Sequence, residues 1–484
     1  MASSDAVILW FRRDLRLADN PALAAALESG RPLLPLHVLD DDAPGPWRPG
    51  AAARWWLHHS LARLQEALRR RGAALVLRRG AAGEALDRLI VETGAAEIHW
   101  NRLYEPWAIV RDGAIKDRLK RRGIRAQSHN AALVAEPWEL ATGAGRPYKM
   151  FTPFWRALRA RATPTVGSGG PRKIPAPARP PAGDALADWN LLPRLGWAGG
   201  IAAAWTPGED GALRRLGEFL DERLADYATG RDRLDLPGTS RLSPHLHWRE
   251  VGPRQIWQAV ATRADADPAL ADAAEAHLRE LGWREFSHHL LFHWPELPEA
   301  PWRAEFARFA WRDDPAGLEA WQRGRTGYPI VDAGMRELWA TGWMHNRVRM
   351  IAASFLVKDL LLPWQAGEAW FWDTLVDADL AQSAASWQWV AGSGADAAPY
   401  FRVFNPVSQG EKFDPRGAYV RRWVPELAEL PDRWLHRPWT APAEALAAAG
   451  VALGDGYPLP CVDHGVARGR ALSVWQAMRR DEEE

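Results

Sequence analysis

Two aspartates, Asp377 and Asp379, lie two residues apart in a segment rich in alanine and tryptophan. Paired carboxylates can bind a metal ion or serve as an acid–base pair. The sequence offers no further metal ligand nearby and no nucleophile with a base, so the carboxylates could equally accept hydrogen bonds from a polar ring system. His345 has no partner at metal-ligand spacing and Cys461 is the only cysteine, so we predict no metal site.

Hydroxyl side chains gather just after the turn at Pro237 and Gly238, directly before a helical stretch. Hydroxyls and free backbone N–H groups at a helix start can bind a phosphate or pyrophosphate. Serine and threonine also cap helices where no ligand binds, so the pattern alone leaves both interpretations open. The hydroxyl residues are Thr239, Ser240 and Ser243.

Two helical segments each present polar and large apolar side chains on one face. Glu280, Trp283 and Arg284 follow the i, i+3, i+4 spacing, which places a carboxylate, an indole and a guanidinium together. Such a face could stack and hydrogen-bond a flat base, or it could be an ordinary Glu–Arg pair beside a core tryptophan. A second face of this kind carries Asn346, Arg349 and Met350.

These side chains need a scaffold, and residues 1–130 predict the first part of it. Short apolar runs alternate with amphipathic stretches, which predicts an α/β domain with a doubly wound parallel sheet covered by helices on both faces. The turn RRDLR at residues 12–16 lacks the G-x-G-x-x-G pattern of a dinucleotide site. The predicted strands are residues 7–11, 32–40, 74–79 and 97–101, and the predicted helices are residues 21–29, 51–71, 83–93 and about 106–122.

The rest of the chain has a different character. Residues 162–184 are dense in proline and glycine, which predicts an interdomain linker, and we assign residues 131–200 to it. From residue 201 to about residue 475 helical periodicity dominates, which predicts one all-α domain. Its clearest predicted helices are residues 211–227, 271–292 and 332–361.

The composition is that of a globular protein, with 47% apolar and 25% charged residues in 484. Lys and Arg number 61 against 60 acidic residues, a net charge of +1, so any nucleic-acid site must gather its positive charge on one face. The start of the sequence shows no secretory signal, and no run has the length of a membrane span, so we expect a cytoplasmic protein. Most of the 29 tryptophans should fill the helical core.

Two long segments, taken with the motifs above and in this order, resemble the DNA photolyase and cryptochrome family. They are RTGYPIVDAGMRELWATGWMHNRVRM at residues 325–350 and WQWVAGSGADAAPYFRVFNP at residues 387–406. The resemblance covers nearly the whole chain. It implies a Rossmann-like N-terminal domain, a helical domain that binds FAD in a bent conformation, and a substrate of ultraviolet-damaged DNA whose pyrimidine dimer is flipped out of the duplex.

The resemblance also implies which residues bind FAD. Arg349 and Asp377 would pair near the isoalloxazine, where charges can tune its redox potential. Asp379 would accept hydrogen bonds from the polar edge of the ring, and Asn346 would lie between flavin and substrate. The implied contacts to the adenine side, phosphates and ring further include Tyr227, Thr239, Ser240, Leu242, Ser243, Arg284 and Ser383.

For the substrate, the resemblance implies a cavity with Trp283 and Trp389 as two walls, Met350 against the lesion and Glu280 hydrogen-bonded to its carbonyl edge. Excited reduced flavin would donate an electron to the dimer, the ring would split, and the electron would return. The residues implied to contact DNA phosphates are Arg231, Arg347 and Arg402. The tryptophans implied to carry an electron from the surface to the flavin are Trp311, Trp364 and Trp387.

Within this family the closest fit is to repair of cyclobutane pyrimidine dimers, because Trp283, Met350 and Trp389 occur together. Ser383 departs from the family pattern, which has Asn facing the flavin N5. Serine offers no amide, so we expect a poorly stabilised neutral flavin radical and faster oxidation of the reduced flavin. The alternatives are a cryptochrome-type photoreceptor and, from composition alone, a nucleotide-binding protein without photochemistry.

A second, light-harvesting pigment is a further expectation from the resemblance. The region from Asn101 to Trp107 aligns with one that can line such a site, but Trp107 and Ala108 do not match the polar pair of the best-known folate-binding enzymes. Methenyltetrahydrofolate at another location, a deazaflavin, or no antenna remain as alternatives. We expect a monomer.

Overall fold

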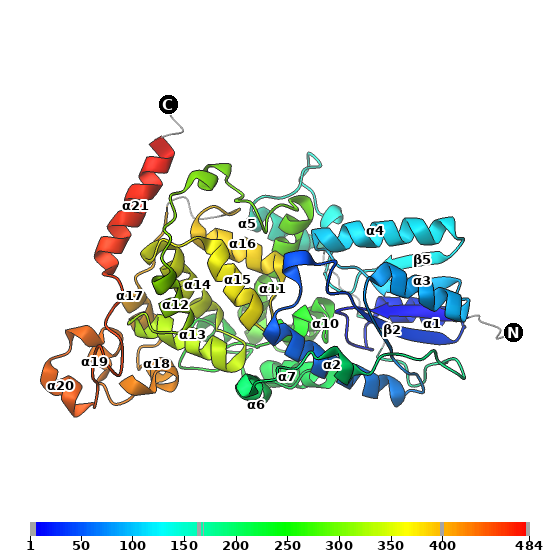
Figure 1. Ribbon diagram of the computed structural model, residues 1–484, viewed down its shortest axis with the longest axis horizontal. Helices are drawn as coiled ribbons and strands as arrows, with labels where there is room; N and C mark the ends of the chain where they lie inside the picture. Colours follow the sequence, from blue (N-terminus) through cyan, green and yellow to red (C-terminus); the bar gives the residue numbers. More distant parts are fainter. Residues whose placement is uncertain (1–5, 162–165, 168, 397–400, 481–484) are drawn as a thin grey trace.

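The computed structural model describes residues 6–161, 166–167, 169–396 and 401–480 (Figure 1). Its N-terminal part is a five-stranded parallel sheet in the order β3-β2-β1-β4-β5, which confirms the predicted doubly wound α/β fold. The strands are β1 (Val7–Phe11), β2 (Leu33–Leu39), β3 (Val76–Arg79), β4 (Glu97–Asn101) and β5 (Arg125–His129). The helices between them are α1 (Pro21–Glu28), α2 (Ala51–Arg69), α3 (Ala82–Thr93) and α4 (Pro106–Arg121).

The apolar runs predicted β1, β2 and β4 because every residue of these strands is buried, and they predicted β3 because its first two residues, Val76 and Leu77, are apolar and buried. The fifth strand was missed, since its sequence RAQSH is polar and only partly buried. It lies at the edge of the sheet, where backbone pairing with β4 suffices to form a strand without an apolar run.

The second half of the chain is helical, as predicted, and it encloses the largest apolar core of the protein. The long helix α11 (Ala271–His293) lies at its centre and contacts α5, α10 and α16. The helices from α5 to α13 are α5 (Phe151–Arg161), α6 (Gly199–Ala204), α7 (Glu209–Glu222), α8 (Tyr227–Gly230), α9 (Ser243–His247), α10 (Pro253–Ala266), α11, α12 (Pro315–Gln322) and α13 (Pro329–Thr341). The remaining ones are α14 (Asn346–Ser354), the π-helical turn η7 (Phe355–Asp359), α15 (Trp364–Thr374), α16 (Leu380–Ala391), α17 (Pro406–Phe413), α18 (Ala418–Trp423), α19 (Asp432–Leu435), α20 (Ala443–Ala448) and α21 (His464–Arg480).

Two predicted helices were too long. The helix predicted for residues 332–361 is broken at Gly342, whose φ of +67° is left-handed and ends α13. A Cβ at this position would lie 2.7 Å from Val376 Cγ1, so the tight turn favours glycine. The chain re-enters a helix at α14, where His345 accepts a hydrogen bond from Arg347 N. The helix predicted for residues 211–227 ends at Glu222, and α8 follows as a separate turn.

The segment between the two halves does more than connect them. Helix α5 lies within the range predicted as the linker, and its buried side chains pack into the core of the helical half. The chain then returns to the sheet, because Leu33 N donates to Pro175 O at 2.6 Å and Asp184 N donates to Leu77 O at 2.9 Å. None of the described helices combines the length and hydropathy needed to cross a membrane.

Candidate active site

Arg349 and Asp377 form an ion pair, with 2.8 Å between Arg349 Nη2 and Asp377 Oδ2. The pair joins α14 to the turn that precedes α16. Arg349 Nε also donates to Met344 O at 2.8 Å, which fixes the plane of the guanidinium. The pairing predicted for these two residues is therefore present, in a position where one carboxylate and one guanidinium are held rigidly.

Asp379 caps α16 by accepting a hydrogen bond from Gln382 N at 3.1 Å. Two buried imidazoles face its carboxylate, with His247 Nδ1 at 3.6 Å and His288 Nε2 at 3.7 Å from Oδ2. Burial opposes ionisation of Asp379, but the facing imidazoles His288 and His247 hold its pKa well below the usual range. Burial lowers the pKa of His288 to about 4 and also lowers that of His247. At neutral pH an ionised carboxylate thus lies between two neutral imidazoles.

This carboxylate has hydrogen-bonding capacity to spare. Among the described residues only Gln382 N reaches it at short hydrogen-bond distance. His247 Nδ1 and Arg284 Nε are buried without a hydrogen-bond partner in the same neighbourhood. An ionised acceptor with unfilled lone pairs, beside the unpaired donor Arg284 Nε, fits a bound ring that carries both N–H and C=O groups, as isoalloxazine does.

Ser383 lies one turn into α16 and interacts with the carboxyl group of Glu368 on α15. Glu368 is 2% exposed, and burial raises its pKa to about 8 although the interaction with Ser383 opposes the change. Sequence reasoning did not single out Glu368. The available signal was a lone carboxylate in the otherwise apolar, tryptophan-rich run WQAGEAWFW.

The predicted hydroxyl cluster lies next to Tyr227. A Cβ at Gly238 would lie 2.2 Å from Gly230 O, so the turn that begins the cluster packs directly on α8, the helix of Tyr227. Ser243 begins α9, and its hydroxyl accepts a hydrogen bond from Trp343 Nε1 at 3.0 Å. Thr239 and Ser240 are half-buried in the turn, whereas Leu242 is buried.

Trp283 is half-buried, and one face of its ring is covered by Phe151. The two rings are stacked with centroids 3.6 Å apart and planes 8° from parallel. Phe151 comes from α5, and no sequence pattern had marked it as part of the site. Gly282 on α11 leaves room for Trp155, which lies on α5 like Phe151, because a Cβ at residue 282 would lie 2.4 Å from the Trp155 ring. The indole is therefore held flat from behind, as a stacking wall requires.

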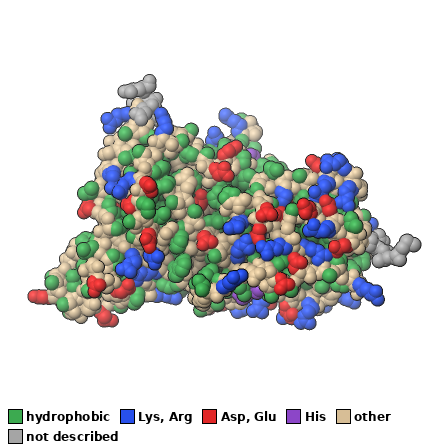
Figure 2. All heavy atoms as spheres, in the orientation of Figure 1, with side chains coloured by type: hydrophobic (Ala, Val, Ile, Leu, Met, Phe, Trp, Pro, Cys, Tyr) green, Lys and Arg blue, Asp and Glu red, His purple; other side chains and the backbone are tan. Residues whose placement is uncertain are grey.

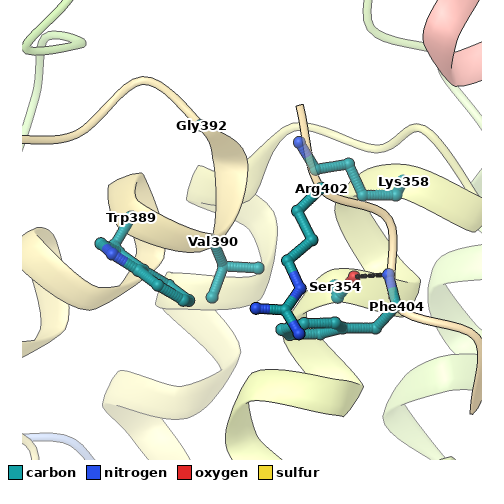
Figure 3. A pocket seen from close by; sticks show the side chains of 7 residues that line it. All are labelled: Ser354, Lys358, Trp389, Val390, Gly392, Arg402 and Phe404. Atoms are coloured by element: carbon teal, nitrogen blue, oxygen red, sulfur yellow. Dashed lines mark hydrogen bonds between the residues drawn. The ribbon is translucent and has the colours of Figure 1, made fainter. Parts of the chain in front are cut away.

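Trp389 is the second predicted wall, and it is tied to the first. Trp389 Nε1 donates to Asp396 O at 3.2 Å, and the Asp396 carboxylate accepts a hydrogen bond from Phe151 N at 3.2 Å. Figure 3 shows Trp389 and Arg402 at the edge of a small cavity, beside the hydrogen bond from Phe404 N to Ser354 Oγ. Asp396 thus connects Trp389 to Phe151, the residue that covers one face of Trp283.

A basic cavity of about 500 Å³ shares Arg402 with the small cavity beside Trp389. Arg347 lines it and pairs with Asp232 at 2.8 Å, while Met350 Sδ lies 3.9 Å from Arg347 Nη1. Four cations against one acid make this cavity positive, although acidic and basic side chains are interspersed over the face seen in Figure 2. Its lining residues are Thr229, Asp232, Arg233, Arg347, Arg402, Gln409, Lys412 and Phe413.

Three other predicted residues lie around this region. Glu280 pairs with Arg231, so its carboxylate is held by a cation and remains partly exposed. Asn346 is exposed at the start of α14. Arg284 lies on the helix of Trp283 but is buried, and it donates to Ala132 O at 2.8 Å.

The three predicted electron-carrying tryptophans differ in exposure. Trp364 and Trp387 are buried, and Trp311 is half-buried. The Trp387 ring packs against Phe371 at 5.1 Å, and a Cβ at Gly367 would lie 2.2 Å from Trp387 Cη2. This helix pair is therefore packed around the indole. Trp311 lies against Phe309, with ring centroids 4.3 Å apart.

Comparison with known proteins agrees with this arrangement. Residues 277–477 match the family model described as the FAD binding domain of DNA photolyase, and residues 7–179 match the DNA photolyase model. Both halves of the chain thus match models of photolyases, a class of light-dependent flavoproteins. The chain belongs to the DNA photolyase family.

Similar proteins cover almost its full length. The deoxyribodipyrimidine photo-lyase of Agrobacterium fabrum is 51% identical over 98% of both chains. The crystal structure of a bacterial class III photolyase from Agrobacterium tumefaciens superimposes with a TM-score of 0.95, at 50% identity and over 99% of both chains. Cryptochrome-1 of Arabidopsis thaliana is 43% identical over 97% of this chain and 70% of that protein.

Proposed function

We propose that this chain is a deoxyribodipyrimidine photolyase that splits cyclobutane pyrimidine dimers in DNA with blue light. One observation carries the proposal. The indole Trp389 donates to Asp396, and Asp396 also accepts a hydrogen bond from Phe151, the ring stacked on Trp283. Arg402 lines both the small cavity beside Trp389 and a basic cavity suited to DNA phosphates. The full-length similarity to photolyases supports repair over the photoreceptor alternative.

FAD would bind in the helical domain. Asp379 would accept hydrogen bonds from the ring, and the Arg349–Asp377 pair would hold a fixed charge arrangement beside it. When bound and reduced, FAD supplies a photoexcited electron that splits the dimer and then returns, so the reaction has no net oxidation. The other residues proposed to contact FAD are Tyr227, Thr239, Ser240, Leu242, Ser243, Arg284, Asn346 and Ser383.

The protein's own part in the reaction is to bind and orient the damaged bases. Base–aromatic stacking contributes about 1–3 kcal/mol per base, and Phe151 keeps Trp283 flat for this purpose. Glu280 would turn its carboxyl group from Arg231 toward the carbonyl edge of the dimer, while Met350 packs against the lesion. Arg231, Arg347 and Arg402 would bind DNA phosphates, which makes affinity fall steeply with salt.

Electron supply to the flavin is proposed to follow the tryptophans Trp311, Trp364 and Trp387, from the partly exposed ring to the buried ones. A second pigment, methenyltetrahydrofolate or a deazaflavin, would add its own absorption band to the purified protein. A photolyase from Sulfolobus tokodaii whose structure contains two FAD molecules is 29% identical to this chain. Extraction and chromatography of the bound pigments would identify any antenna.

A cryptochrome-type photoreceptor is the second candidate, favoured by Ser383 and by the similarity to Cryptochrome-1. Affinity for damaged DNA separates the two candidates. A duplex with one thymine dimer should bind far more tightly than the undamaged duplex, and Trp283→Ala should reduce this preference. The matched control is Trp339→Ala, an exposed indole stacked on Trp370. Equal affinity for both duplexes would favour the photoreceptor.

A further inference from the structure

The carboxylate Asp379 belongs to the helical domain, but side chains of the N-terminal domain reach its surroundings. Tyr104, which follows β4, places its ring edge-on to His288 with centroids 6.4 Å apart. His288 in turn faces Asp379 at 3.7 Å. The N-terminal domain therefore contributes to the wall behind the proposed flavin site.

Two charged residues lie in this wall. Arg13 follows β1 and Glu105 follows β4, and their side chains form an ion pair at the carboxyl ends of adjacent strands. Glu105 is 5% exposed, and its Oε2 also accepts a hydrogen bond from Tyr104 N at 3.1 Å. Arg249 of the helical half donates to Arg102 O at 2.9 Å in the same interface.

These charges act on the site across the interface. Burial would raise the pKa of Glu105, but Arg13 and Arg249 outweigh it and lower the pKa, so Glu105 is ionised at neutral pH. The charge of Glu105 also interacts with that of Asp379. The charge of Arg13 likewise acts on His247, the imidazole that faces Asp379.

Stability alone gives little reason for such a pair. A buried ion pair contributes no more to stability than well-packed apolar residues of similar volume, because both charges lose their hydration. Neither residue lines the basic cavity or the indole walls. They are distinguished by their place beside Tyr104, whose ring contacts His288, and by the electrostatic interaction of their charges with Asp379 and His247.

We propose that Arg13 and Glu105 are an interdomain positioning pair that sets the electrostatic potential at Asp379 and thereby the midpoint potential of the flavin. The proposal rests on the proposed function, because it takes Asp379 as the partner of bound FAD. In this arrangement the α/β domain tunes a cofactor that the helical domain holds.

Removal of each of the two charges should shift the midpoint potential of the flavin in opposite directions. Reduction adds negative charge to a flavin, so a nearby anion disfavours the reduced form and a nearby cation favours it. Glu105→Gln should shift the midpoint potential upward, and Arg13→Gln should shift it downward. The double variant removes both charges and should return close to the parent value.

The test is spectroelectrochemical titration of the purified FAD-bound protein and its variants. Arg78→Gln is the control, because Arg78 forms an ion pair with Glu92 elsewhere in the same domain and should leave the potential unchanged. Opposite shifts that cancel in the double variant would support the proposal. Unchanged potentials, or two shifts in the same direction, would overturn it.

A second comparison keeps the test decisive if Glu105→Gln does not fold. Arg13→Lys retains the cation and should keep the parent potential, whereas Arg13→Gln should lower it. Equal potentials for these two variants would overturn the proposal. Failure of the parent protein itself to bind FAD would instead contradict the proposed function, so the two failures are distinguishable.

Discussion

The interior of the N-terminal sheet and the interior around Asp379 differ in the side chains that they bury. Every residue of β1 is apolar and buried. Buried charged residues of this domain include Arg12, Asp14 and Glu105, which follow the carboxyl ends of β1 and β4, while His37 and His99 lie within strands. The helical half groups buried ionisable side chains around one carboxylate, Asp379, and buries others within its apolar core. Among them are Asp379, His247, His288, Glu368 and Lys358.

This difference separates two tasks. Burial of apolar surface is the main stabilising contribution to folding, whereas a buried ionisable group lowers stability unless it is paired. The sheet therefore contributes stability and holds loops at its carboxyl edge, and the helical core gives up some stability to hold charges beside a cofactor. Truncation in the sheet core should therefore lower stability without affecting FAD binding, whereas removal of Asp379 should lower FAD affinity.

The largest expected change in stability comes from Leu34→Ala in β2. Leu34 is fully buried in the sheet core, so the cavity should lower the free energy of unfolding by about 2–5 kcal/mol. Denaturant unfolding measures this loss. The dissociation constant of FAD should stay within about twofold of the parent value. A large loss of FAD affinity would contradict the view that the sheet core contributes to stability and not to FAD binding.

Asp379→Ala should produce the opposite pattern. Hydrogen bonds to a charged group contribute about 1.5–3 kcal/mol, so FAD affinity should fall by about ten- to a hundredfold. Fluorescence of released FAD measures the dissociation constant. Asp221→Ala, at an exposed carboxylate on α7, is the control. FAD binding that withstands Asp379→Ala would remove this residue from the site.

The buried carboxyl of Glu368 should make stability depend on pH. Its pKa is about 8 in the folded protein against an ordinary value of 4.5, so its contribution is fully present below about pH 4.5 and is lost as the pH rises through 8. One such proton gives a slope of at most about 1.4 kcal/mol per pH unit.

Glu368→Gln should flatten this part of the profile, as measured by denaturant unfolding between pH 5 and pH 9. Glu92→Gln, at a partly exposed carboxylate, should leave the profile of the parent protein unchanged. Parallel profiles for the parent and Glu368→Gln would show that Glu368 is not protonated in the folded state.

The smallest effect is expected from Ser383→Asn. Asparagine would supply the amide that serine lacks, so the reduced flavin should oxidise in air a few times more slowly than in the parent. Absorbance after photoreduction follows this rate, and Ser386→Asn, at an exposed position on the same helix, is the control. An unchanged or faster oxidation would contradict the role assigned to Ser383.

Local sequence patterns predicted the parts of this protein whose burial follows a simple period. The apolar runs identified β1 to β4, whereas the polar edge strand β5 left no such signal. Helix α11 was predicted almost to its ends, but the break at Gly342 depends on a close approach to Val376 from a distant segment.

The site shows the same limit. The Arg349–Asp377 pair was expected and is present. Phe151, Glu368 and the imidazoles around Asp379 were not expected, because they come from separate helices that only tertiary packing brings together.

Light-dependent repair tests the central claim most directly. The FAD-bound protein is reduced, mixed with an oligonucleotide that contains a thymine dimer, and followed by recovery of thymine absorbance in blue light and in darkness. We expect recovery in light only, with loss of this recovery in Trp283→Ala and not in Trp339→Ala. No recovery in light, with FAD bound and reduced, would contradict the assignment of this chain as a dimer-repairing photolyase.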